Sequence, residues 1–450
     1  SIFFYRNTGA SDSLIGELLA WEQKWEDKFQ ALKKYFKEAH PKYFQLKYGR
    51  TPISLDQINR FLTPNQAILE FFVRNNQLTW FLFAQDLAIW EVMELDSDLN
   101  QALRDFREGT NTVSAQSNDF ERLVRASHRV YQRLLAKPIQ ALKDHKDQHW
   151  RLSIINDGPL HFISWASALP QLPSPNLMND PSGWDFLVKD RSLTLSQQHS
   201  LQIAMATQAP AKDTYENRYG AVGAWYADRD IPEGRKAIEH IIRSEAWANS
   251  SEAYLGSPSA PLTASLFWDL GGKSQIFHIS GHGLPNWNNP MQSRILLSST
   301  DSITVGDFYQ RSLPSRLVIL DACEMNLGPA MEGEGVMSFA TGIFYAGPPT
   351  VLASLWQVEE KASAFLIPAF LDGINEGLAV DVAWQNAQIK FLHEYRGNKH
   401  PFYWASITSI GNMAPLYAPG RKRIWLFSGL ALVLLLGGWW LWGQRTGAKD

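Results

Sequence analysis

Short apolar runs alternate with amphipathic helical patterns between residues 152 and 395, and this alternation restricts the fold more than any other feature. Parallel strands need long crossover connections, which are usually helices, so the pattern predicts a mostly parallel sheet covered by helices. Hydrophobic residues make up 45% of the chain and charged residues 19%, which is enough apolar material for a large core. We therefore expect an α/β fold. The strand-like runs are residues 152–156, 221–225, 252–255, 275–280, 316–321 and 350–356.

Two of these runs end in residues that a thiol hydrolase needs. One run stops just before Gly281-His282-Gly283, and another stops just before Ala322-Cys323, which holds the single cysteine of the 450 residues. In parallel α/β sheets, functional side chains gather at the carboxyl ends of the strands. The glycines beside His282 would let a substrate backbone approach it closely. The opposing interpretation is a cysteine buried as a small hydrophobe and a histidine with a structural role.

The order of these motifs resembles the CHAT domain, a caspase-like branch of the cysteine peptidases that includes separase and the caspases. The resemblance implies a caspase-like sheet flanked by helices and a cysteine endopeptidase that cleaves protein substrates without a cofactor or a metal. It runs from about residue 51 to residue 412. Further segments that carry it are Leu55–Val73, Leu78–Phe83, Asn156–His161, Ser354–Val358 and His400–Ala405.

The resemblance also implies a role for each candidate residue. Cys323 would attack the peptide carbonyl, His282 would give a proton to the leaving amine, and the backbone N–H groups of Gly283 and Cys323 would form the oxyanion hole. In some relatives an acidic residue at the place of Asp321 reads a basic side chain before the scissile bond. The alternative for Asp321 is a structural role in its loop. His278 and His282 share a face of a strand, so a metal pair is the remaining alternative there.

Charge and cysteine content exclude other classes of function. The net charge of −3 argues against a nucleic-acid-binding domain, because such domains are usually basic. A single cysteine can form neither an intrachain disulfide nor a cysteine metal site, and it suits a reducing compartment where a catalytic thiol stays reduced. Because residue 1 is Ser and not Met, we expect the sequence to be a processed chain or a piece of a longer one.

The pattern divides the chain into a helical segment at residues 1–50 and a CHAT domain at residues 51–418. From residue 14, apolar residues recur every three or four positions, which predicts a helix with one apolar face. In the resembling family, helical repeats often precede the CHAT domain, so this segment would be a remnant of such repeats. One helical pair is fewer than a solenoid needs.

The C-terminal region carries a membrane signal. Residues 424–442 are nineteen consecutive residues without a charge, with Trp residues near both ends, which predicts one transmembrane helix followed by a short tail at 443–450. The basic residues 421–423 place the catalytic domain in the cytoplasm of a single-pass cell-membrane protein. A buried core helix is the alternative for this segment.

Two classes of function therefore compete. The first is a membrane-tethered, caspase-like cysteine endopeptidase that cleaves cytoplasmic proteins through a Cys–His dyad and a thioester intermediate. The second is a catalytically silent CHAT-fold interaction module at the membrane, and a different thiol hydrolase or transferase also stays open. For the peptidase, we expect a regulatory protein or self-association at the membrane as the activating partner, because confinement there raises encounter rates.

Overall fold

The structure, a computed structural model, describes residues 12–39, 52–113, 117–198, 200–206, 214–224, 231–286, 288–322, 330–331, 335–336 and 338–417. The chain divides into two compact units, with the second beginning at residue 58. Cys323 and the predicted transmembrane segment 424–442 both lie outside the described residues. Within the described ranges, no helix is long and apolar enough to cross a bilayer, and the membrane segment stays a prediction.

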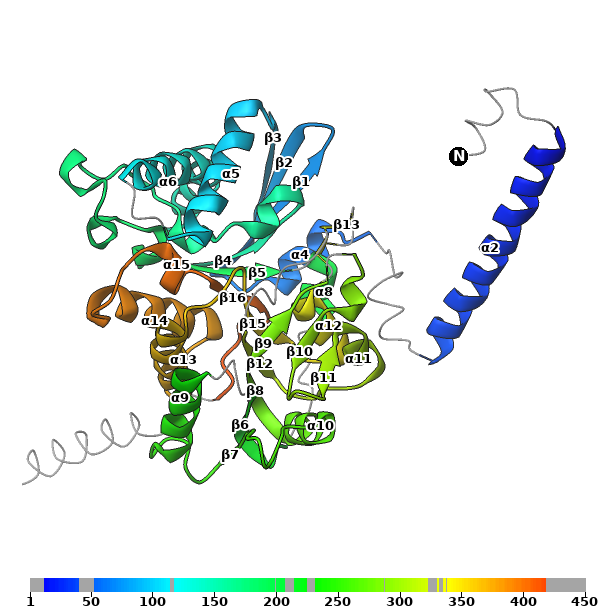
Figure 1. Ribbon diagram of the computed structural model, residues 1–450. Helices are drawn as coiled ribbons and strands as arrows, with labels where there is room; N and C mark the ends of the chain where they lie inside the picture. The colour runs from blue at the N-terminus through cyan, green and yellow to red at the C-terminus, as the bar shows by residue number, and fades with distance from the viewer. Residues whose placement is uncertain are drawn as a thin grey trace, which may run out of the picture. The chain divides into compact units, whose positions relative to one another are not determined.

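The first unit contains α2 (Asp12–Ala39), a helix of 28 residues where the apolar periodicity predicts one (Figure 1). Residues four apart lie on the same side of a helix, and Trp21 and Trp25 meet there with their ring centroids 5.9 Å apart. The rest of the predicted helical segment, residues 40–50, lies outside the described residues.

The second unit is built on a sheet that has eleven strands within the described residues. Seven of its strand pairings are parallel and three are antiparallel, in the part of the chain that the structure describes. The prediction of a mostly parallel sheet is therefore confirmed. In spatial order the strands are β3 (Leu87–Glu94), β2 (Gln77–Ala84), β1 (Gln66–Arg74), β4 (Trp150–Ile155), β5 (Leu193–Gln198), β16 (Ile407–Gly411), β15 (Thr350–Ser354), β12 (Leu317–Asp321), β8 (Ser274–Ser280), β6 (Asn217–Gly223) and β7 (Ser251–Leu255).

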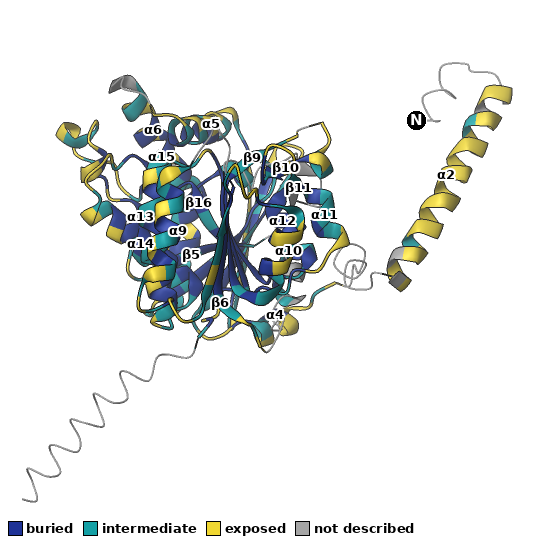
Figure 2. Cartoon of the chain, turned by 60° about the horizontal axis from the view of Figure 1, so that its bottom comes forward, coloured by how far each residue is buried: buried dark blue, intermediate teal, exposed yellow. Residues whose placement is uncertain are grey.

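Helices cover both faces of this sheet, as Figure 2 shows with α9, α13 and α14 on one side and α10, α11 and α12 on the other. The described helices of the second unit and its border are α4 (Leu55–Phe61), α5 (Ser97–Asn111), α6 (Ser117–Val130), α7 (Ala136–His145), α8 (Leu201–Ala206), α9 (Pro232–Arg243), α10 (Ala264–Lys273), α11 (Val305–Gln310), α12 (Phe339–Ala346), α13 (Glu360–Asn375), α14 (Val380–Glu394) and α15 (Pro401–Trp404).

The central strands are apolar on both faces because each face packs against helices. On β12, Leu317 and Ile319 join the core beneath α9, α13 and α14, whereas Val318 and Leu320 join the core beneath α10, α11 and α12. All five residues of β12 are buried. This two-sided burial explains why the run is continuously apolar until Asp321, its last residue.

Two small sheets accompany the large one. Antiparallel strands β9 (His282–Leu284), β10 (Arg294–Leu296) and β11 (Ser302–Thr304) form the first, and they lie directly after β8 in the chain. Strands β13 (Ala330–Met331) and β14 (Gly335–Val336) form the second. The connection between β9 and β10 is irregular and contains one 3₁₀ turn at Pro290–Gln292.

Candidate active site

The two strands that precede the predicted dyad are neighbours. Strand β8 pairs with β12 in parallel, and the pairing continues to Ser280 opposite Asp321, the last residue of each strand. One residue further, Gly281 N–H donates to the carbonyl of Asp321 at 3.2 Å. The two segments that carry the candidate residues therefore leave the sheet at the same edge and side by side.

His282 is the first residue of β9, and its side chain is half-buried. It pairs opposite Leu296, and Gly283 pairs opposite Ile295, so the β9–β10 ladder fixes the backbone at both positions. Gly281 lets this turn approach β6: a Cβ at that position would lie 3.1 Å from the Cβ of Ala224. The backbone of His282 is thus held by its pairing with β10.

The residue before Cys323 is anchored by a side chain whose role the sequence did not reveal. Ser354, the last residue of β15, donates its hydroxyl to the carbonyl oxygen of Ala322 at 2.6 Å, and both residues are buried. Ser354 belongs to a segment that carries the family resemblance, but the sequence pattern alone indicated no role for it. The bond fixes the direction in which the chain leaves β12.

The side chain of Asp321 belongs to a buried polar cluster, which consists of Tyr219, His278, Ser280 and Asp321. Ser280 Oγ–H donates to Asp321 Oδ2 at 3.3 Å, and His278 Nε2 lies 3.8 Å from the same oxygen. Tyr219 Oη and His278 Nδ1 are 2.7 Å apart. The metal pair of His278 and His282 stays an untested alternative, because engagement of Nδ1 leaves Nε2 of His278 as a possible ligand atom. The described residues contain no group of three or more His, Cys, Asp or Glu placed to hold a metal ion.

The Asn156–His161 motif has a structural task. Asp157 accepts from the N–H of Val73 at 2.7 Å and from Gly158 N–H at 2.9 Å, while Asn156 accepts from Trp165 Nε1–H. Gly158 has a positive φ of 56°, which glycine adopts without strain. Strand β4, which precedes the motif, is four strand positions from β12, or about 19 Å at ordinary strand spacing. The motif secures the β1–β4 end of the sheet and not the dyad.

His400 is a second structural histidine in a motif that carried the resemblance. Its Nδ1 accepts from Phe402 N–H at 3.2 Å and so caps α15, and its ring meets Phe120 edge-to-face. An acceptor nitrogen must be unprotonated, and burial lowers the pKa of His400 to about 4.

We expect His400 to make stability fall in mild acid. Its folded-state pKa lies below the unfolded value of 6.5, so the unfolded chain takes up the proton first and stability drops as pH falls from 6.5 towards 4. The loss attributable to this group reaches about 3 kcal/mol. His400→Asn keeps a capping oxygen without the titration, so urea unfolding at pH 7 and pH 4.5 should show a smaller pH effect in the variant. Equal pH effects in both proteins would refute the assignment.

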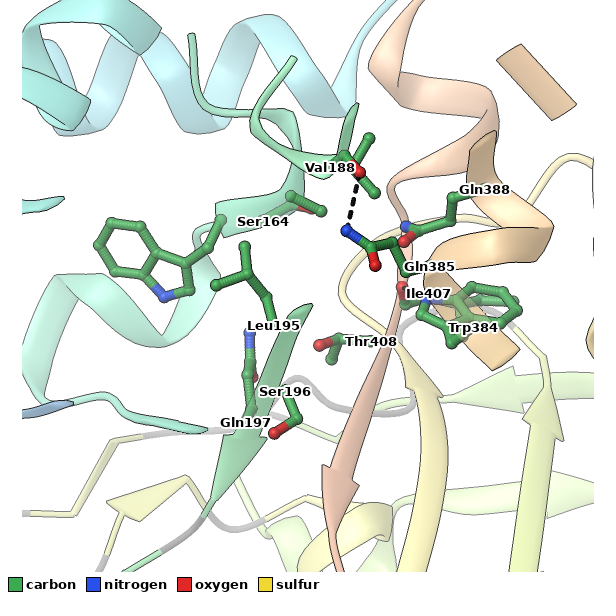
Figure 3. A pocket seen from close by; sticks show the side chains of 12 residues that line it. Ser164, Val188, Leu195, Ser196, Gln197, Trp384, Gln385, Gln388, Ile407 and Thr408 are labelled. Atoms are coloured by element: carbon green, nitrogen blue, oxygen red, sulfur yellow. Dashed lines mark hydrogen bonds between the residues drawn. The ribbon is translucent and has the colours of Figure 1, made fainter. Parts of the chain in front are cut away.

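A small cavity lies away from the dyad strands (Figure 3). Its volume is about 30 Å³, enough for a water molecule and too small for a peptide side chain. Gln385 on α14 lines the cavity, and its side-chain amide donates to the carbonyl of Val188 at 3.0 Å. The cavity is part of the packing between α14 and the sheet and is not a substrate site. Its other lining residues are Ser164, Trp165, Ala166, Leu195, Ser196, Gln197, Trp384, Gln388, Ile407 and Thr408.

A family model described as the CHAT domain matches residues 124–412, which is more than half of the chain. The chain belongs to the CHAT family. The match begins inside α6, so β1, β2 and β3 precede it even though β1 pairs with β4 in the same sheet. The sheet, which has eleven strands within the described residues, therefore begins before the matched range.

Parts of the chain are also similar to curated proteins and to solved structures. Tetratricopeptide repeat protein 28 from Homo sapiens is 30% identical over 117 residues, which are 26% of this chain and 5% of that protein, and the Mus musculus protein is 27% identical over the same length. The fold resembles that in a crystal structure of the Saccharomyces cerevisiae separase–securin complex, with a TM-score of 0.52, 10% identity, and 79% of this chain and 30% of that one covered. The CHAT chain thus spans a small part of either protein, and the structural likeness concerns the fold alone.

Proposed function

We propose that this CHAT protein is a cysteine endopeptidase in which Cys323 and His282 form the catalytic dyad. The observation that carries the proposal is the pairing of Ser280 with Asp321, because His282 and Cys323 each follow two residues after one member of that pair. The anchoring of the Ala322 carbonyl by Ser354 adds support, since a nucleophile needs a fixed backbone before it.

The proposed reaction has two steps. The Cys323 thiolate attacks the carbonyl carbon of the scissile peptide bond, and His282 gives its proton to the leaving amine as the C–N bond breaks. A thioester between Cys323 and the acyl part of the substrate remains. Water then adds to the thioester, the C–S bond breaks, and the acid leaves while the thiol is restored. The N–H groups of Gly283 and Cys323 would stabilise the oxyanion in both steps.

We further propose that Asp321 binds the cationic side chain of a Lys or Arg before the scissile bond. Its carboxylate is buried, and a buried carboxylate needs a compensating charge. Among the described residues, its polar neighbours are Ser280 and His278, and no Lys or Arg forms a salt bridge with it. A substrate cation would supply the missing charge.

The dyad is tested with the full chain and a peptide library that varies the residue before the cleaved bond. We expect the wild type to cleave, with preference for Arg and Lys, and Cys323→Ala to keep only a trace residual rate while unfolding at the same temperature. Cleavage by Cys323→Ala at a substantial fraction of the wild-type rate would refute the nucleophile. A folded wild type that cleaves no peptide and no protein would favour the silent interaction module.

Tethering of the peptidase to a membrane by residues 424–442 is part of the proposal and rests on the sequence. Nineteen uncharged residues have the length of one bilayer span. Full-length protein expressed in cells should stay in the membrane pellet through alkaline carbonate extraction and move to the soluble fraction when this segment is deleted. Release of the full-length chain by carbonate would contradict the anchor.

A further inference from the structure

The polar cluster beneath Asp321 runs diagonally across three strands of the sheet. Tyr219 on β6, His278 on β8 and Asp321 on β12 occupy alternate positions that face the α9 and α13 side, each one step nearer the carboxyl edge than the last. The neighbouring positions on this face are apolar, such as Ile276 and Ile319. A line of polar groups through an apolar layer is costly unless each group has a partner.

Hydrogen bonding determines which nitrogen of His278 carries the proton. Tyr219 is fully buried, and burial, with a further contribution from Asp321, raises the pKa of its phenol well above the usual value, so it keeps its hydrogen. Within the described residues, the acceptor for that hydrogen is His278 Nδ1 at 2.7 Å. If Nδ1 accepts, the proton of the neutral imidazole is on Nε2.

The Nε2–H of His278 then lies on the side of the ring that faces Asp321. His278 is 1% exposed, and its Nε2 has no hydrogen-bond partner among the described residues. Asp321 Oδ2 lies 3.8 Å from Nε2, too far for a direct hydrogen bond but close enough for the N–H dipole to act on the carboxylate. A buried polar group left unpaired at a site calls for an explanation, and a functional role is one.

A glycine lets the first turn of α9 pack closely on the cluster. Gly234, in the first turn of α9, stands where a Cβ would lie 2.9 Å from Ser280 Oγ and 3.9 Å from Asp321 Oδ2. The backbone N–H groups of Glu233 and Gly234 are already satisfied by Glu360 on α13. The helix end therefore covers the cluster without competing for the carboxylate of Asp321.

We propose that His278, with its tautomer fixed by Tyr219, is a positioning and specificity-determining residue that holds Asp321 as an oriented anion for a cationic substrate side chain. This inference rests on the proposed peptidase function and deepens it. His278 does not touch the scissile bond: it acts through Asp321, so its loss affects the binding of a charged side chain and not the chemical step.

The test compares two peptide substrates that differ only in having Arg or citrulline before the scissile bond, because citrulline keeps the shape of Arg without its charge. In full-length His278→Leu, the Arg-to-citrulline ratio of kcat/KM should fall about tenfold, the worth of one interaction with a charged group, through KM and not kcat. His278→Gln, which places an amide N–H near the position of Nε2–H, should recover most of the ratio. Asp321→Asn should abolish the preference.

A second measurement needs no activity. In the Cys323→Ala protein with ¹⁵N-labelled histidine, His278 should appear as the neutral Nε2–H tautomer, its Nε2 signal should move in Asp321→Asn, and Tyr219→Phe should populate both tautomers. This measurement also serves if His278→Leu does not fold. A Nδ1–H tautomer in the unaltered cluster would overturn the proposal.

The outcomes separate this inference from the function beneath it. If His278→Leu lowered kcat/KM equally for the Arg and citrulline substrates, the role of His278 would be overturned and the peptidase left intact. The same would follow if the Arg-to-citrulline ratio kept its wild-type value in His278→Leu but was lost in Asp321→Asn. An unchanged ratio in Asp321→Asn, with cleavage still abolished by Cys323→Ala, would overturn both roles but not the dyad. Cleavage that survives Cys323→Ala would remove the reaction on which the inference rests.

Discussion

Replacing His282 with Ala should lower kcat/KM for peptide cleavage by about 10²–10⁴-fold, the usual worth of a general acid or base. The side chain is half-buried at the start of β9, where the backbone is held by pairing with β10, so the substitution should leave the fold intact. His393→Ala is the matched control, because that histidine is exposed on α14, and it should cleave at the wild-type rate.

The double variant sharpens this prediction. If His282 and Cys323 act as one unit, His282→Ala with Cys323→Ala should be no slower than Cys323→Ala alone, because residues that act together lose their effect together. If the fold-loss in kcat/KM of the double variant equalled the product of the two single losses, the two side chains would act independently. The dyad would then be wrong.

The second large effect concerns stability and the ion pair between Arg151 and Asp381. The guanidinium donates to both carboxylate oxygens at 2.8 Å, and the side chains are 15% and 2% exposed. Asp381 also accepts from Thr194 Oγ–H at 3.2 Å, while Arg151 donates to the carbonyl of Met413. The pair thus joins α14 to β4, to β5 and to the chain after β16.

Asp381→Ala should lower the free energy of unfolding by about 3–5 kcal/mol, because it leaves a guanidinium buried without its counter-charge. The control is Glu121→Ala, which breaks an exposed pair with Arg125 and should cost about 0.5 kcal/mol or less. Urea unfolding of the two variants measures the difference. A loss for Asp381→Ala as small as that of the control would contradict a structural role for the buried pair.

Strands that are buried on both faces could be predicted from the sequence. Strands β8 and β12 are continuous apolar runs, and each was predicted within a residue of its observed bounds. Strands β5 and β16 were missed, because Thr194, Ser196, Gln197 and Ser409 are polar although all four are buried. Thr194, for example, is buried with its hydroxyl on Asp381, 187 positions away, and no local pattern contains that partner.

The candidate site also has a part that could be predicted from the sequence and a part that could not. The ends of β8 and β12 could be read from the sequence, because the apolar pattern stops there. The polar cluster could not, because the contacts of His278 with Tyr219 and Asp321 depend on the register between β6, β8 and β12. A signal was present: His278 and Asp321 interrupt or end the apolar runs of β8 and β12, and Tyr219 carries a hydroxyl next to the apolar part of β6. That the three residues contact one another becomes clear only when the order and register of the strands are known.

If His282 activates the thiol of Cys323, the reactivity of that thiol can be measured directly, because the chain has a single cysteine. The full-length protein is treated with a peptide ending in Arg that carries an electrophilic ketone, and the intact mass is followed over time. We expect one adduct per chain, on Cys323, formed at least about 100-fold more slowly in His282→Ala. A thiol that reacts only after denaturation, or at the same rate without His282, would contradict it.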